Sequence, residues 1–138
     1  MAAMKFFDPL QPLALLLMRV AAGAVLAVHG WYKILDYARS HVHLVESLHL
    51  PGWLAYLSVA AEFIGGLLLI AGLLTRLAAL AATIDMAVAV TLVHWPHGLT
   101  GPGGFEFPLA ILALCFALMA FGAGPLSLDR GLLHHRWG

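Results

Sequence analysis

Four long apolar stretches dominate this chain and limit what it can fold into. They cover residues 12–29, 51–74, 77–95 and 105–122. A helix needs about 17–25 mostly apolar residues to cross roughly 30 Å of hydrocarbon at about 1.5 Å per residue. Each stretch meets this requirement, so the sequence predicts four membrane-spanning helices.

The composition indicates the same class of protein. Of the 138 residues, 62% are hydrophobic, whereas soluble domains have about 45–50% hydrophobic residues. Only 10% are charged, whereas soluble domains have about 25% charged residues. A soluble domain of this size cannot hide so much apolar side chain from water. The formal net charge is zero, which provides no basic surface for nucleic acid. The single cysteine, Cys115, excludes an internal disulfide and a paired-cysteine redox site.

The connections between the stretches predict how the helices are arranged. Leu74-Thr75-Arg76 leaves room only for a tight turn, and glycine and proline in residues 96–104 end the third helix and precede the fourth. Within residues 31–50, apolar residues recur at helical spacing between polar ones, which predicts a short amphipathic helix on the membrane surface. We therefore expect an all-α, integral membrane, antiparallel four-helix bundle in a single domain, with this surface helix between helices one and two.

The distribution of basic residues predicts the orientation. An even number of spans puts both termini on one side of the membrane, and that side carries more basic residues than the other. The side of the termini carries Lys5, Arg76, Arg130 and Arg136, and the opposite side carries Lys33 and Arg39. The positive-inside rule then places both termini in the cytoplasm, and Trp31, Trp53 and Trp95 form a belt at the outer interface.

Three ionisable residues fall deep inside the predicted spans, where a charge facing lipid costs at least about 2.5–3.5 kcal/mol. They are Arg19, Glu62 and Asp85. We expect a midplane network in which Arg19 pairs with Asp85 or Glu62, while the remaining carboxyl is protonated or hydrogen-bonded. The network either serves function or only fixes the register of the helices.

A second polar set lies toward the outer ends of the four helices. It consists of His29, Lys33, Glu62, His94 and Glu106. If these side chains converge on one outward-opening cavity, their mixture of donors and carboxylates suits a quinone head group or a small oxyanion. Taken singly, each is weak evidence, because a histidine at a helix end is more often a solvated residue at the membrane interface.

Haem and a metal ion are the two alternatives to a ligand in this cavity. His29 and His94 are a histidine pair that could hold haem, but they lie near the membrane edge and no second pair exists. His41, His43 and His49 lack a reliable metal-ligand spacing. We therefore predict no metal site, and the sequence contains no haem, flavin or iron–sulfur motif.

Several short motifs, taken in order, resemble the DoxX family of small bacterial membrane proteins. They are Arg19 with Ala22-Gly23, His29-Gly30-Trp31-Tyr32-Lys33, Leu50-Pro51, Ala61-Glu62-Phe63-Ile64-Gly65-Gly66, Gly72-Leu73-Leu74-Thr75-Arg76, His94, Gly104-Phe105-Glu106 and Gly124-Pro125-Leu126-Ser127-Leu128-Asp129. The resemblance implies a four-helix membrane protein of the bacterial plasma membrane. One branch of that family is similar to a subunit of thiosulfate:quinone oxidoreductase.

Three functions remain open at this stage. The first is a redox-linked membrane subunit that binds a quinone and exchanges electrons with a soluble redox protein or directly with its substrate. The second is a non-catalytic anchor or assembly factor for a redox complex. The third is a proton-coupled transporter of a small solute with Glu62 and Asp85 as proton carriers, which in so short a chain requires a homo-oligomer.

Overall fold

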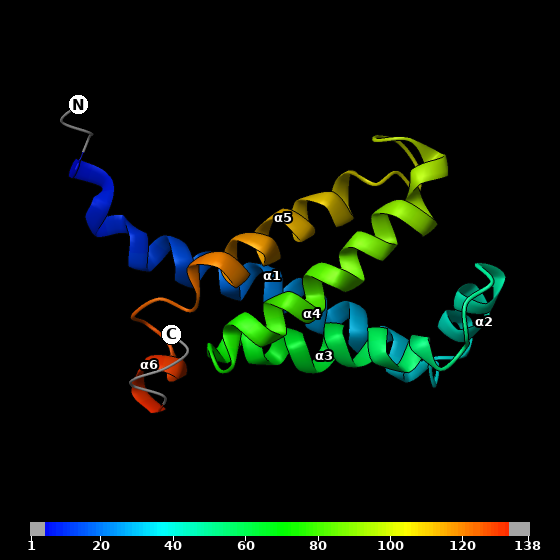
Figure 1. Cartoon of the computed structure of the whole chain (residues 1–138), viewed down its shortest axis with the longest axis horizontal. Coiled ribbons are helices and arrows are strands. Elements are labelled where there is room, and N and C mark those ends of the chain that lie inside the picture. The colour runs from blue at the N-terminus through cyan, green and yellow to red at the C-terminus, as the bar shows by residue number, and fades with distance from the viewer. Residues whose placement is uncertain (1–4, 133–138) are drawn as a thin grey trace.

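The computed structural model describes residues 5–132, and this part of the chain contains helices and no strand (Figure 1). The elements in order are η1 (Lys5–Leu10), α1 (Gln11–Leu35), α2 (Arg39–Ser47), α3 (Leu54–Ala71), α4 (Thr75–Val88), η2 (Ala89–His94), η3 (Trp95–His97), α5 (Glu106–Phe121) and α6 (Leu128–Leu132). The prediction of an all-α membrane bundle is confirmed. Arg136, which entered the orientation argument, lies outside the described residues.

The helices differ in length from the predicted spans. Three continuous helical segments are long and apolar enough to cross a membrane: Lys5–Leu35, Leu54–Ala71 and Thr75–His97. The fourth predicted span is the apolar helix α5, which has 16 residues. The third segment continues beyond α4 through the π-helical turn η2, so the chain stays helical as far as the proline-containing turn at Trp95–His97.

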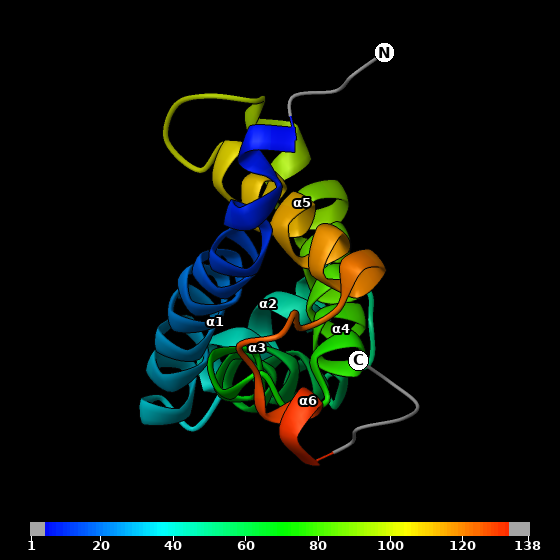
Figure 2. The same cartoon turned by 90° about the vertical axis from the view of Figure 1, so that its left-hand side faces the viewer.

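Helix α3 lies between α1 and α4, and α5 packs against α4 and also contacts α1 (Figure 2). Small residues bring α1 and α3 together: a Cβ atom added at Gly66 would lie 2.6 Å from the backbone of Gly23 and Ala27. At Gly30, an added Cβ would lie 2.6 Å from the backbone nitrogen of Phe63. Inside a membrane the hydrophobic effect does not drive helices together, because lipid tails are as apolar as the side chains. Small residues instead let the backbones approach closely and pack by van der Waals contact.

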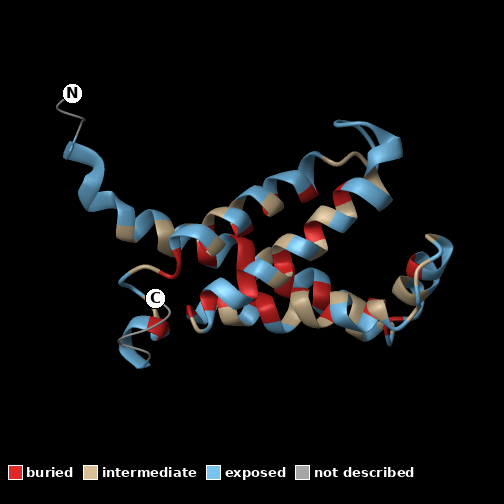
Figure 3. Cartoon of the chain, in the orientation of Figure 1, coloured by how far each residue is buried: buried red, intermediate tan, exposed pale blue. Residues whose placement is uncertain are grey.

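The buried core is confined to the facing sides of the helices, and their outer faces are apolar and exposed (Figure 3). Leu26, Leu69 and Cys115 are almost fully buried. In contrast, Leu57 and Ile84 each expose 58% of their surface. Exposed apolar side chains on spanning helices face lipid, which removes the cost they would carry in water.

Arg19 does not pair with Glu62 or Asp85, so the predicted midplane network is wrong for this residue. Its Nη1 donates to the Leu69 carbonyl at 3.4 Å, and its Nη2 donates to the carbonyl of Leu126. Leu69 lies seven residues beyond Glu62 in α3, which is about 10 Å along the helix axis. The physical reason is that the last carbonyls of α3 form the negative end of its helix dipole, which attracts the Arg19 cation.

Asp129 completes this end of the bundle from the far end of the chain. Its carboxylate accepts hydrogen bonds from the backbone N–H groups of Leu74 at 2.6 Å and Thr75 at 2.9 Å, where α4 begins. Its own N–H donates to the Gly72 carbonyl at 2.8 Å. Gly72 ends α3 with a φ of +69°, and a side chain there would collide with the Arg19 guanidinium. Arg19 and Asp129 together, called here the turn cluster, fix the α3–α4 connection.

Candidate ligand-binding cavity

A cavity of about 590 Å³ runs along the groove between α3 and α4 and is covered at one end by α2. Most of its wall is apolar, with side chains from α3, α4 and α2. Those lining residues are Leu44, Val45, Leu48, Leu50, Leu54, Leu57, Ala60, Ala61, Ile64, Gly65, Leu68, Leu77, Ala78, Ala81, Ile84, Val88, Ala89 and Val93. Leu57, Ile64, Leu77 and Ile84 are each more than half exposed, so the groove opens sideways onto the lipid-facing surface.

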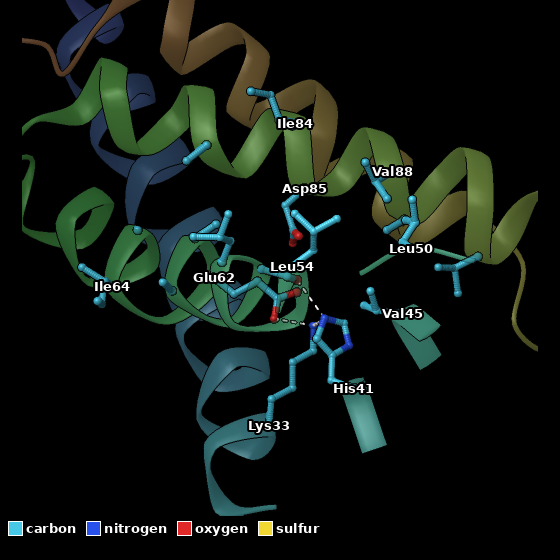
Figure 4. A pocket seen from close by; sticks show the side chains of 18 of the residues that line it. Lys33, His41, Val45, Leu50, Leu54, Glu62, Ile64, Ile84, Asp85 and Val88 are labelled. Atoms are coloured by element: carbon cyan, nitrogen blue, oxygen red, sulfur yellow. Dashed lines mark hydrogen bonds and ion pairs between the residues drawn. The ribbon is translucent and has the colours of Figure 1, made fainter. Parts of the chain in front are cut away.

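The polar side chains of the cavity gather at the end near α2 (Figure 4). They come from four helices and are called here the head cluster: Lys33, His41, Ser58, Glu62 and Asp85. Lys33 Nζ lies 2.7 Å from Glu62 Oε2 and forms an ion pair with it. His41 Nε2 lies 2.9 Å from Ser58 Oγ and 3.4 Å from Lys33 Nζ.

Asp85 enters the head cluster from the opposite wall. Its carboxyl lines the cavity together with Ser58 and Glu62, and both of these side chains interact with it. Glu62 is the ninth residue of the 18-residue helix α3, and Asp85 follows Thr75 by ten residues in the third apolar segment. Both carboxyls therefore lie near the middle of their helices, at the depth predicted from the sequence.

His41 is neutral at ordinary pH. Burial and the neighbouring Lys33 charge lower the pKa of its imidazole to about 4. An ammonium group only donates, so the unprotonated Nε2 of the neutral ring faces both the Lys33 ammonium and the Ser58 hydroxyl, and the ring carries its proton on Nδ1. The surface helix α2 thus contributes a neutral hydrogen-bonding side chain to the head cluster.

Three residues predicted to share the cavity lie elsewhere. His29 Nδ1 lies 2.8 Å from the Val25 carbonyl of its own helix, and its ring stacks on Phe107 with centroids 5.7 Å apart. His94 Nδ1 lies 2.8 Å from the Gly103 carbonyl. Glu106 is exposed in the first turn of α5.

The separation follows from the two faces of α4. Ala82 and Met86 turn toward α5 and join the core with Ile111 and Cys115, whereas Asp85 turns toward α3 and the cavity. Among the described residues, α5 provides none of the cavity lining. Of the predicted set, the structure therefore brings together Lys33 and Glu62, and adds Asp85 from the predicted midplane network.

Ser58 was not among the predicted cavity residues, and His41 lies in the expected surface helix α2 but with a different role. Ser58 precedes Glu62 by four residues and so shares its face of α3. His41 was considered as a surface metal ligand, yet it lies on the same face of α2 as Val45 and Leu48, which line the cavity. In the described part of the chain, no three His, Cys, Asp or Glu side chains are grouped as a metal site requires.

Comparison with known proteins identifies relatives over most of the chain. The sequence model of the DoxX family matches residues 14–95, a range that holds the whole head cluster. The chain is 31% identical over 114 residues to a Bacillus subtilis protein named "Putative oxidoreductase CatD", covering 83% of each chain. It is 30% identical to the Escherichia coli "Inner membrane protein YqjF", covering 93% of this chain and 98% of that one. No solved structure matches the chain at comparable significance.

Proposed function

Because this chain belongs to the DoxX family of membrane proteins, we propose that it is a quinone-binding, redox-linked component of an oxidoreductase system in the bacterial inner membrane. The observation that carries the proposal is the shape of the cavity, an apolar groove that opens toward lipid and ends in polar side chains. The names of the relatives, one an oxidoreductase and one an inner membrane protein, support the same reading.

The cavity matches the chemistry of a lipid-soluble quinone. Such a molecule carries two carbonyl oxygens on a ring and a long apolar tail. Lys33, Ser58 and a protonated Asp85 can donate hydrogen bonds to a ring carbonyl, while Leu57 and Ile84 line the open side where a tail would pass into the bilayer. A volume of about 590 Å³ lies within the usual range of about 300–1,000 Å³ for ligand sites.

Electrons reach or leave the quinone through a second redox centre in this proposal. The sequence contains one cysteine and no haem, flavin or iron–sulfur motif. The second centre is therefore assigned to a soluble redox protein or to the substrate itself. The part of this chain is to bind the quinone ring and orient its oxygens.

Quinone retention tests the proposal. Wild-type protein purified in detergent should carry quinone, measured by mass spectrometry as moles per mole of protein. Lys33→Met keeps the aliphatic stem but removes the charge, and loss of one charged hydrogen bond, worth about 1.4 kcal/mol or more, should lower quinone affinity about tenfold. Lys5→Met changes the other lysine, an exposed residue in η1, and should retain quinone fully.

Two results would overturn the proposal. One is wild-type protein that neither co-purifies with quinone nor binds added quinone, which would favour the anchor or assembly role. The other is Lys33→Met protein that stays folded and retains quinone as well as Lys5→Met does.

We further propose that both termini face the cytoplasm. Ser40 is exposed at the start of α2, and an added Cβ at Gly131 meets no atom within 4 Å. In intact cells, a cysteine at position 40 should react with an impermeant maleimide reagent, and a cysteine at position 131 should not. The opposite labelling pattern would reverse the orientation.

A further inference from the structure

We propose that Asp85, Ser58 and His41 form a proton relay between the cavity and the α2 side of the protein. The relay rests on the proposed function for its purpose, because a quinone that gains or loses two electrons also gains or loses two protons. Its existence rests only on the arrangement of side chains in the head cluster.

Charge balance identifies the proton-holding group. The ionisable side chains of the cavity are Lys33 from α1, His41 from α2, Glu62 from α3 and Asp85 from α4. The single ammonium is already paired with Glu62 at 2.7 Å. A second carboxylate without a cation in an apolar groove is strongly disfavoured. Asp85 avoids this cost by holding a proton.

Ser58 connects Asp85 to the surface helix. Its hydroxyl lies 2.9 Å from His41 Nε2, and it lines the same cavity as Asp85, with which it interacts. A hydroxyl both accepts and donates, so it can take a proton from Asp85 while passing its own to the imidazole. His41 is half-buried, and with Nε2 facing Ser58 its proton lies on the other ring nitrogen, Nδ1.

Each transfer in the relay is balanced. The Asp85 O–H proton moves to Ser58 Oγ, the Ser58 proton moves to His41 Nε2, and the resulting imidazolium releases its Nδ1 proton to water. The net result is that one proton leaves the cavity and one proton enters water, and no group is oxidised or reduced. The reverse sequence delivers a proton to the cavity.

The turn cluster shows why this arrangement indicates proton transfer. There, the buried Asp129 carboxylate accepts hydrogen bonds from two backbone N–H groups. Asp85 instead shares the cavity with the Ser58 hydroxyl and the Glu62 carboxyl, which both interact with it. A carboxyl placed between two groups that exchange protons can itself exchange one.

The relay is tested in protein stripped of quinone, by infrared spectroscopy. A band from a protonated carboxyl should be present at neutral pH, be lost in Asp85→Asn and persist in Asp129→Asn. After transfer to D₂O this band should shift rapidly in the wild type and about 100-fold more slowly in Ser58→Ala and His41→Phe, as expected when a positioned proton carrier is removed.

Two matched variants make the result specific. Ser58→Thr keeps the hydroxyl and should restore fast exchange, which a purely structural role for Ser58 would not require. Ser47→Ala, at an exposed serine of α2, should exchange like the wild type. Reaction of the buried Cys115 with a thiol dye reports whether each variant is folded.

The outcomes separate the relay from quinone binding. Absence of the Asp85 band, or unchanged exchange in folded Ser58→Ala, overturns the relay even if quinone still binds. If fast exchange depends on Ser58 and His41 but no quinone binds, the relay stands and the proposed function fails.

Discussion

The turn cluster and the head cluster both place charge inside an apolar protein, but they use different partners. Arg19 and Asp129 bind main-chain groups at the ends of α3 and α4. Lys33 and Glu62 bind each other and face a cavity. Main-chain partners cannot be removed by substitution, whereas a pair of side chains can be replaced together.

This difference separates the groups that hold the fold from those available to a ligand. Loss of a charge from the turn cluster leaves buried N–H or C=O groups without partners, which costs stability. Loss of both charges of the ion pair leaves nothing unsatisfied, and such replacements are often neutral or stabilising. The head cluster is therefore the place where substitutions can change function without unfolding the bundle.

The largest loss of stability is expected for Arg19→Leu. It removes the donors to Leu69 and Leu126 and leaves Asp129 near an uncompensated helix end, at a cost of about 3–5 kcal/mol. The rate at which a thiol dye labels Cys115 on heating gives the melting temperature in detergent. Arg76→Leu, at an exposed arginine one residue into α4, is the matched control and should melt like the wild type. An unchanged melting temperature for Arg19→Leu would contradict its structural role.

Asp129→Ala should destabilise the protein by a smaller amount. The N–H groups of Leu74 and Thr75 lose a charged acceptor, and a charged hydrogen bond contributes about 1.5–3 kcal/mol. The same Cys115 labelling assay measures this effect. Asp8→Ala, which alters an exposed aspartate of η1, should leave the melting temperature unchanged. Equal effects of the two substitutions would show that Asp129 does not fix the turn.

The head cluster should behave differently when its ion pair is replaced. Lys33→Met alone leaves Glu62 without its cation and should lower the melting temperature. Adding Glu62→Gln should bring stability back to within about 1 kcal/mol of the wild type, as read from Cys115 labelling. If the double variant is as unstable as Arg19→Leu, the two clusters do not differ in the way described.

The sequence predicts how deep in the membrane the buried charged residues lie. It does not predict which groups they bind. Counting residues placed Glu62 and Asp85 near the middle of their helices, and the structure agrees. The partners of Arg19 are two carbonyl oxygens, and every residue in a sequence carries one, so no pattern marks them. His29 and His94 were misassigned because a residue near a helix end gives little indication of which neighbouring helix it faces.

His41 should make the stability of the protein depend on pH. The pKa of its imidazole is about 4 in the folded protein and about 6.5 in an unfolded chain. The unfolded state therefore binds the proton first as pH falls, so the stabilisation is complete above about pH 6.5 and is lost on the way down to about pH 4. Melting temperatures across this range should fall less steeply for His41→Gln than for the wild type. His43→Gln, an exposed neighbour on α2, should keep the wild-type slope.

The capping of α4 by Asp129 has a consequence for the order of events during biosynthesis. Ribosomes make the α3–α4 hairpin before residues 126–129 exist, so the hairpin enters the membrane with the Leu74 and Thr75 N–H groups still lacking their acceptor. At that point the Gly72 carbonyl also lacks its donor, the N–H of Asp129. Arg19 likewise lacks its acceptor, the carbonyl of Leu126. The insertion machinery thus handles a hairpin whose turn gains its hydrogen-bond partners only after α5 has been translated. A chain shortened before Asp129 would keep the turn without these partners, and membrane quality-control proteases would then degrade it.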